Sequence, residues 1–193
     1  MLLHPAVSSA LELIPVMPAM PAEVPDQVPV AQLLAVQTQP PGALPALPRL
    51  GYPLAQLALQ IDPWGWRYSE SRAAWRMHTG VDFAAPIGTP VLAALGGRVV
   101  LAESINGYGL TVLLEHPDGL QTLYAHLDQI VVRLGDELAE GEALGTVGMT
   151  GRTTGPHLHF ELRRGTPDQQ LAIDPTPYLP PLQPPPTLTA SGP

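Results

Sequence analysis

The sequence predicts an all-β protein with an antiparallel β-sheet core, and three observations support this. Between about residues 51 and 179, short apolar segments alternate with turn-forming pairs such as Asn106-Gly107. No segment in that region carries a helical apolar stripe longer than two turns. The 25 prolines of the chain gather before and after it. We therefore expect many short strands between two proline-rich tails.

The expected strands follow one another at short intervals. Gly96-Gly97, Asn106-Gly107 and Pro117-Asp118-Gly119 predict the turns between them, the last one a hairpin turn. A further strand through His157–Leu162 follows from strict alternation of polar and apolar residues. The other predicted strands, in order, are Pro90–Leu95, Arg98–Ala102, Leu110–Glu115, Gln121–Leu127, Ile130–Arg133 and Ala143–Val147.

Proline content divides the chain into three parts. Residues 1–50 form a proline-rich N-terminal segment or linker with at most a short helix near Ala31–Gln37. Residues 51–179 form the β domain, and residues 180–193 form a disordered proline-rich tail. Residues 1–20 are apolar, but the first basic side chain is Arg49, so a secretory signal is not clear. No proline-free apolar run reaches about 18 residues, so no transmembrane segment is predicted.

The charge balance excludes several functions. The net charge is −8, with nine arginines and no lysine, and this is the opposite of what nucleic acid or an anionic membrane attracts. Cysteine is absent, so disulfides and thiolate metal sites are impossible. Val91–Val100 and residues 135–145 resemble biotinyl and lipoyl carrier modules, which attach their cofactor to lysine. Because this chain has no lysine, that similarity reflects only a shared β architecture.

Three histidine motifs carry the chemistry. In the strand through His157-Leu158-His159, alternation places His157, His159 and Glu161 on one face. In His78-Thr79-Gly80-Val81-Asp82, an extended chain would separate the two end residues by roughly 13 Å. The chain must therefore bend, which Gly80 permits, if both bind one metal.

The third motif is Leu123-Tyr124-Ala125-His126-Leu127, in which alternation predicts that Thr122, Tyr124 and His126 share a polar strand face. Taken singly, the His157-Leu158-His159 motif is close to balanced between function and surface histidines, whereas the other two motifs are more typical of chance spacing and of an ordinary strand histidine. Together they supply what a metallohydrolase needs: three His or carboxylate ligands, an open position for water, and further histidines for proton transfer or oxyanion stabilisation. A His-Glu-x-x-His helix is absent from the sequence.

Ordered along the chain, these motifs resemble the LytM/lysostaphin-type zinc metallopeptidases, peptidase family M23. The similarity runs from about Trp64 to Leu162, and its segments are Gly65-Trp66-Arg67, His78–Pro86, Gly88–Val91, Gly97–Val100, Tyr108-Gly109, Tyr124–Leu127, Gly148–Gly151 and Thr154–Glu161.

The resemblance implies a fold and a site. The fold is an antiparallel sheet core of the duplicated-hybrid-motif kind with an open groove, lined here by loops near Ser69–Met77 and Ser104–Tyr108. The site holds one Zn²⁺ per chain through His78, Asp82 and His159. His126 and His157 form the catalytic pair, with their individual roles left open. Glu161 either hydrogen-bonds to a ligand histidine and fixes its ring or has a purely structural role, while His4 and His116 are expected to be exposed and idle.

The resemblance also implies a zinc-dependent endopeptidase that hydrolyses peptidoglycan stem peptides or cross-bridges in the periplasmic or extracellular cell envelope. Some members cut between glycines and others cut at meso-diaminopimelate or D-alanine. The main alternative is a non-catalytic LytM-like module that binds cell wall or activates an amidase. A further possibility is that residues 1–50 block the groove, against the simpler view that they are a flexible tether.

Overall fold

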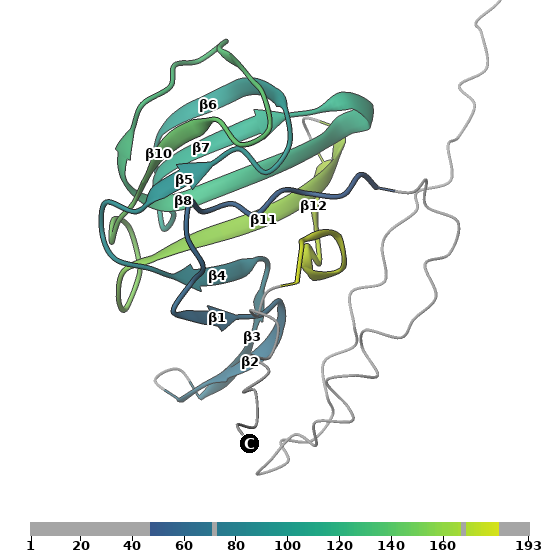
Figure 1. The fold of residues 1–193 in the computed structure, drawn as a ribbon. Coiled ribbons are helices and arrows are strands. Elements are labelled where there is room, and N and C mark those ends of the chain that lie inside the picture. The colour runs from purple at the N-terminus through teal and green to yellow at the C-terminus, as the bar shows by residue number, and fades with distance from the viewer. Residues whose placement is uncertain (1–46, 71–72, 167–168, 182–193) are drawn as a thin grey trace, which may run out of the picture. The chain divides into compact units, whose positions relative to one another are not determined.

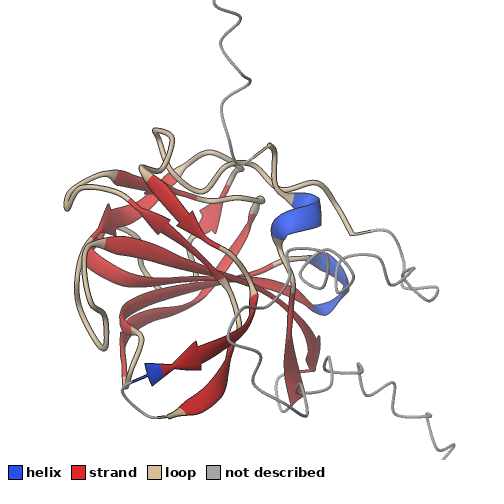
Figure 2. Cartoon of the chain, turned by 90° about the horizontal axis from the view of Figure 1, so that it is seen from below, coloured by secondary structure: helices blue, strands red, loops and turns tan. Residues whose placement is uncertain are grey.

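Strands of two to eleven residues make up most of the computed structural model, which describes residues 47–70, 73–166 and 169–181 (Figure 1). Short 3-10 turns lie at Pro117–Gly119 and Thr176–Tyr178 (Figure 2). The strands are β1 (Gln60–Asp62), β2 (Gly65–Ser69), β3 (Ala74–His78), β4 (Val81–Ala84), β5 (Pro90–Leu92), β6 (Gly97–Ile105), β7 (Gly109–Glu115), β8 (Leu120–Ile130), β9 (Glu137–Leu138), β10 (Ala143–Val147), β11 (His157–Thr166) and β12 (Gln169–Ile173). The predicted all-β class is confirmed.

Most strands join one antiparallel sheet with the order β1-β4-β11-β8-β7-β6-β9. Strand β12 extends the sheet beside β11, while β10 pairs with both β5 and β8. Strands β2 and β3 form a separate hairpin that leads directly into β4 (Figure 1). The long strands β8 and β11 lie next to each other and between β4 and β7, so residues from distant segments meet on one sheet face.

The opposite face of β11 builds the apolar core. Leu158, Phe160 and Leu162 are fully buried there, as strand alternation predicts, and Phe160 packs against Phe83 and Tyr124. A core of this kind supplies most of the stability of a β protein, because each buried large side chain contributes roughly 1.5–3 kcal/mol. Packing of the core therefore fixes the position and the pairing register of β11, and with them the position of its polar face.

The first described residues pack on this core. Leu50 and Leu54 are buried, and the amide of Leu50 donates a hydrogen bond to the carbonyl oxygen of Tyr178 at 2.8 Å. The amide of Gly51 donates to the carbonyl oxygen of Ala94 at 2.6 Å. This segment thus ties the two ends of the β domain together.

Several sequence expectations need correction. Val131–Arg133 is not a strand, since β8 ends at Ile130, and the strand predicted at Pro90–Leu95 ends at Leu92. The pairs β1–β4 and β11–β12 and the hairpin β2–β3 were not predicted. The helix considered at 31–37 and most of both proline-rich tails lie outside the described residues. Within the described ranges, no helix is long and apolar enough to cross a membrane.

His116 is buried, and the expectation that it is exposed is wrong. Only 5% of its surface is accessible. Its Nδ1 lies 2.9 Å from the carbonyl oxygen of Gly96, and its Nε2 lies 2.8 Å from Oγ1 of Thr122, which in turn contacts the hydroxyl of Tyr124. Burial lowers the pKa of His116, so the ring stays neutral near pH 7 and serves the fold.

Candidate metal centre and groove

The bend between β3 and β4 brings His78 and Asp82 together. Nε2 of His78 lies 3.0 Å from Oδ1 of Asp82, far closer than an extended chain would allow. The bend occurs at Gly80, as predicted, but the reason differs. A Cβ atom at Gly80 would lie 2.5 Å from the carbonyl oxygen of Phe160 and 2.8 Å from the ring of His159. Glycine is therefore required by close approach to β11.

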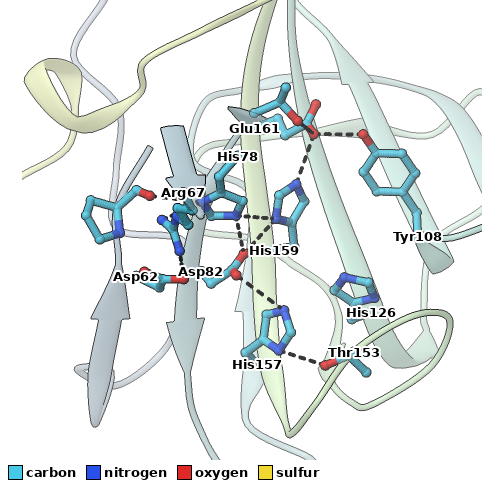
Figure 3. Close-up of polar contacts among 12 residues, drawn as sticks. Asp62, Arg67, His78, Asp82, Tyr108, His126, Thr153, His157, His159 and Glu161 are labelled. Carbon is cyan, nitrogen blue, oxygen red and sulfur yellow. Dashed lines mark hydrogen bonds and ion pairs between the residues drawn. The ribbon is translucent and has the colours of Figure 1, made fainter. Parts of the chain in front are cut away.

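The third residue comes from the neighbouring strand β11. His159 pairs directly with Asp82 across the two strands, which brings its side chain beside the carboxylate. Nδ1 of His159 lies 2.6 Å from Oδ1 of Asp82 and 3.2 Å from Nε2 of His78 (Figure 3). The structure therefore brings together all three residues that the resemblance names as ligands, with their ligand atoms within 4.8 Å of one another.

In each histidine of the cluster, one ring nitrogen faces away from the other ligand residues. The hydrogen bond made by that nitrogen determines whether the nitrogen facing the cluster has a lone pair. Nε2 of His159 donates to Oε1 of Glu161 at 2.9 Å, because a carboxylate can only accept. Nδ1 of His78 lies 2.9 Å from the carbonyl oxygen of Pro63 and 2.8 Å from Nη2 of Arg67, which favour opposite tautomers. The tautomer that donates to Pro63 leaves Nε2 of His78 free to act as a ligand.

The charges of the site favour a cation at this point. Burial would lower the pKa of His159, but hydrogen bonds to Asp82 and Glu161 outweigh it and raise that pKa to about 9. Burial would raise the pKa of Asp82, but hydrogen bonds from His159 and His78 hold it well below its usual range. The surroundings that favour a proton on Nδ1 of His159 favour a divalent cation in the same place. The His₂Asp donor set fits a catalytic zinc site.

Glu161 is the centre of a buried hydrogen-bond network behind His159. Its side chain is completely buried. Oε1 accepts hydrogen bonds from Thr79 at 2.7 Å and from the Tyr108 hydroxyl at 2.9 Å, in addition to His159 (Figure 3). Oε2 accepts from Nε of Arg163 at 2.6 Å. Burial would raise the pKa of Glu161, but His159 and then Arg163 outweigh it and lower that pKa to about 2, so the carboxylate is charged.

Two further histidines face the centre from the other side. Nδ1 of His126 lies 2.8 Å from the carbonyl oxygen of Thr150, and Nδ1 of His157 lies 2.9 Å from that of Gly155. A carbonyl accepts, so each ring carries a hydrogen on Nδ1, and the lone pair of the neutral tautomer is then on Nε2. The ring centroids are 4.8 Å apart, and Nε2 of His157 lies 3.7 Å from Oδ2 of Asp82.

A β-bulge orients His126, and the predicted alternation around it is wrong. Between the pairs Val112–Tyr124 and Leu110–Leu127, β8 contains one residue more than β7. Tyr124 and Leu127 therefore both enter the apolar core, while His126 lines the groove. His126 itself has a positive φ of 60°, which is rare for a residue with a side chain. Burial lowers the pKa of His126, which keeps its ring neutral near pH 7.

These residues line an open groove of about 390 Å³. Arg76 and Met77 of β3 border it, as do Gly107 and Tyr108 of the turn between β6 and β7. Each of these two pairs of residues lies within a loop that the resemblance predicts to line the groove. A third segment, Arg152–Thr154, also lines the groove and was missed. The sequence contained one sign that this segment lines the groove, since it lies between Gly151 and His157, which both belong to the family motifs.

The fold and the site together define an antiparallel β protein whose His₂Asp cluster suits a divalent metal beside two further imidazoles. The sequence profile described as "Peptidase family M23" matches residues 76–175, just over half of the chain. The chain belongs to peptidase family M23.

Individual relatives agree with this assignment. The DD-carboxypeptidase/endopeptidase Mpg of Neisseria meningitidis serogroup B is 44% identical over 120 residues, which cover 61% of this chain and 28% of that protein. The chain thus matches less than a third of that relative's length. A zinc-containing peptidase from Vibrio cholerae superposes with a TM-score of 0.56 at 33% identity, covering 64% of this chain and 39% of that chain. For the catalytic domain of lysostaphin from Staphylococcus simulans, the TM-score is 0.54 at 34% identity, with coverages of 62% and 90%.

Proposed function

We propose that this chain is a zinc-dependent endopeptidase that hydrolyses peptide bonds in peptidoglycan stem peptides or cross-bridges. The observation that carries the proposal is the convergence of His78, Asp82 and His159 beside two imidazoles that keep Nε2 free. Membership of family M23 and the peptidase relatives support it. Peptidoglycan as substrate implies a periplasmic or extracellular place of action.

His78, Asp82 and His159 would hold the metal, and Glu161 would fix the ring of His159 through its Nε2 hydrogen. When bound, a zinc ion supplies Lewis acidity, which polarises the peptide carbonyl and makes water more acidic near neutral pH. The groove is open, so an extended peptide can reach the centre from solvent.

His126 and His157 would handle the proton. One Nε2 takes a proton from water while the water oxygen bonds to the carbonyl carbon. As the C–N bond breaks, the leaving amine receives a proton from one of the two rings. The ring that does not transfer protons can donate a hydrogen bond to the oxyanion. Because both Nδ1 hydrogens are held by carbonyl oxygens, each ring is oriented before substrate arrives.

The direct test combines metal analysis with digestion of purified cell wall. We expect one zinc per chain, lost in His78→Ala and in His159→Ala, and metal-dependent release of new amino groups from the wall. His126→Ala should keep zinc and lose activity, whereas Arg133→Gln, an exposed substitution outside the groove, should change neither. Zinc-loaded protein that releases nothing from any wall type, yet enhances lysis by an added amidase, would contradict the proposal and favour the activator alternative.

A further inference from the structure

Two arginines border the groove from different segments. Arg76 lies on β3 two residues before His78, so both side chains leave the same face of that strand. Arg152 lies on the loop before β11, where its amide donates to the carbonyl oxygen of Gly107 at 2.8 Å. The cationic groups therefore stand on two separate segments of the groove wall, outside the cluster that would hold the metal.

Among the described residues, two further arginines near the site are already engaged. Arg67 forms an ion pair with Asp62, and Arg163 forms one with the buried Glu161. In contrast, Arg76 and Arg152 are exposed, and within the described ranges neither guanidinium has an ion-pair or hydrogen-bond partner. Two cations without internal partners are thus available to a ligand in the groove of a chain whose net charge is −8.

The chemistry of a guanidinium selects the ligand. Its planar array of donors matches the two oxygens of a carboxylate and holds it in a fixed orientation. A glycine bridge offers a backbone without side-chain charge, whereas a stem peptide containing meso-diaminopimelate keeps free carboxylates. Two guanidinium groups therefore complement the second substrate better than the first.

We propose that Arg76 and Arg152 bind carboxylates of the substrate, and that this groove selects carboxylate-bearing stem-peptide cross-links over neutral glycine bridges. This inference rests on the proposed function and adds the substrate class to it. Because both side chains are exposed, each contact is moderate in strength and weakens as salt screens the charges.

The test uses two synthetic cross-linked peptides joined through D-alanine and meso-diaminopimelate. They are identical except that one has free carboxylates and the other has carboxamides in their place, and pentaglycine is the third substrate. For the unchanged zinc-loaded chain we expect kcat/KM to be about tenfold higher on the carboxylate peptide. Arg76→Gln and Arg152→Gln should each lower that value about fivefold, mainly through KM, and leave the carboxamide peptide unaffected. Arg133→Gln is the matched control.

Equal cleavage of the two cross-linked peptides, equal losses on both in the arginine variants, or a preference for pentaglycine would overturn the inference and leave the proposed function standing. A chain that cuts none of the three substrates would contradict the proposed function instead. Calorimetric titration of the full-length His126→Ala chain with each cross-linked peptide decides the inference in that case. Tighter binding of the carboxylate form, lost in Arg76→Gln and at high salt, supports it, and equal binding rejects it.

Discussion

Replacing Glu161 by glutamine should weaken metal binding without unfolding the protein. The carboxylate receives hydrogen bonds from Thr79, Tyr108 and His159 on Oε1 and from Arg163 on Oε2, at 2.6–2.9 Å. Glutamine keeps one oxygen for the first three donors, but its amide group then meets Arg163 donor to donor. The charge that strengthens all four hydrogen bonds is also lost. His159 would consequently be held less firmly, and its Nδ1 would be a weaker ligand.

Outer partners of metal-bound histidines typically contribute 10–100-fold to metal affinity, equivalent to about 1.4–2.7 kcal/mol. Since Glu161 is completely buried and bonded by four groups, we expect the upper half of that range for Glu161→Gln. Zinc affinity is measured by competition with a chromogenic chelator, and the fold is checked by circular dichroism. Glu103→Gln, at an exposed position of β6, is the matched control. A folded Glu161→Gln protein that binds zinc as tightly as the unchanged chain would refute this reasoning.

Three further predictions concern separate parts of the structure. His126→Gln should lower kcat about 10²–10⁴-fold with unchanged zinc content, because it removes a proton-transfer group and no ligand; a peptide-release assay with metal analysis checks this. Gly80→Ala should lower the melting temperature and zinc affinity together, since its Cβ would lie 2.5 Å from the carbonyl oxygen of Phe160; equal values in thermal melts and chelator competition would contradict it. Burial lowers the pKa of His116 below 6.5, so the unfolded chain takes up a proton before the folded one does. Stability present above about pH 6.5 should therefore fall as the pH drops through that value, and His116→Gln should reduce this slope in melts at pH 7.5 and 5.5.

The sequence was sufficient where a simple period governs the chain. In β11, alternation places His157, His159 and Glu161 on one face of the strand and three apolar core residues on the other. The structure has this arrangement. The turns at Asn106-Gly107 and Pro117-Asp118-Gly119 also fall where predicted, because their residues accept positive φ angles. Local rules of this kind need no knowledge of which strands pair.

Pairing between distant strands supplied what the sequence alone could not. His159 meets Asp82 because β11 pairs with β4 in one particular register, and that register is set by packing of the core. Glu161 receives a hydrogen bond from Tyr108, 53 positions away, so its bonding could not be derived from the neighbouring residues. The site geometry is thus a property of the sheet, although its residue types are visible in the motifs.

His126 illustrates how the fold compensates for a strained catalytic candidate. A positive φ at a residue with a side chain costs about 1–2 kcal/mol. Two hydrogen bonds of His126 offset this cost, each contributing about 1 kcal/mol. The amide of His126 donates to the carbonyl oxygen of Tyr108, and its Nδ1 donates to that of Thr150, both at 2.8 Å.

These two carbonyls can approach His126 because the loops that carry them interlock at glycines. A Cβ atom at Gly109 would lie 2.4 Å from the carbonyl carbon of Thr150, and one at Gly151 would lie 2.4 Å from the amide nitrogen of Gly109. The hydroxyl of Thr150 joins the same loops by accepting from the amide of Leu110 and donating to the carbonyl oxygen of Leu127. The Tyr108-Gly109 and Gly148–Gly151 segments of the family pattern therefore act on the site through backbone packing, which holds the strained His126 ring toward the groove.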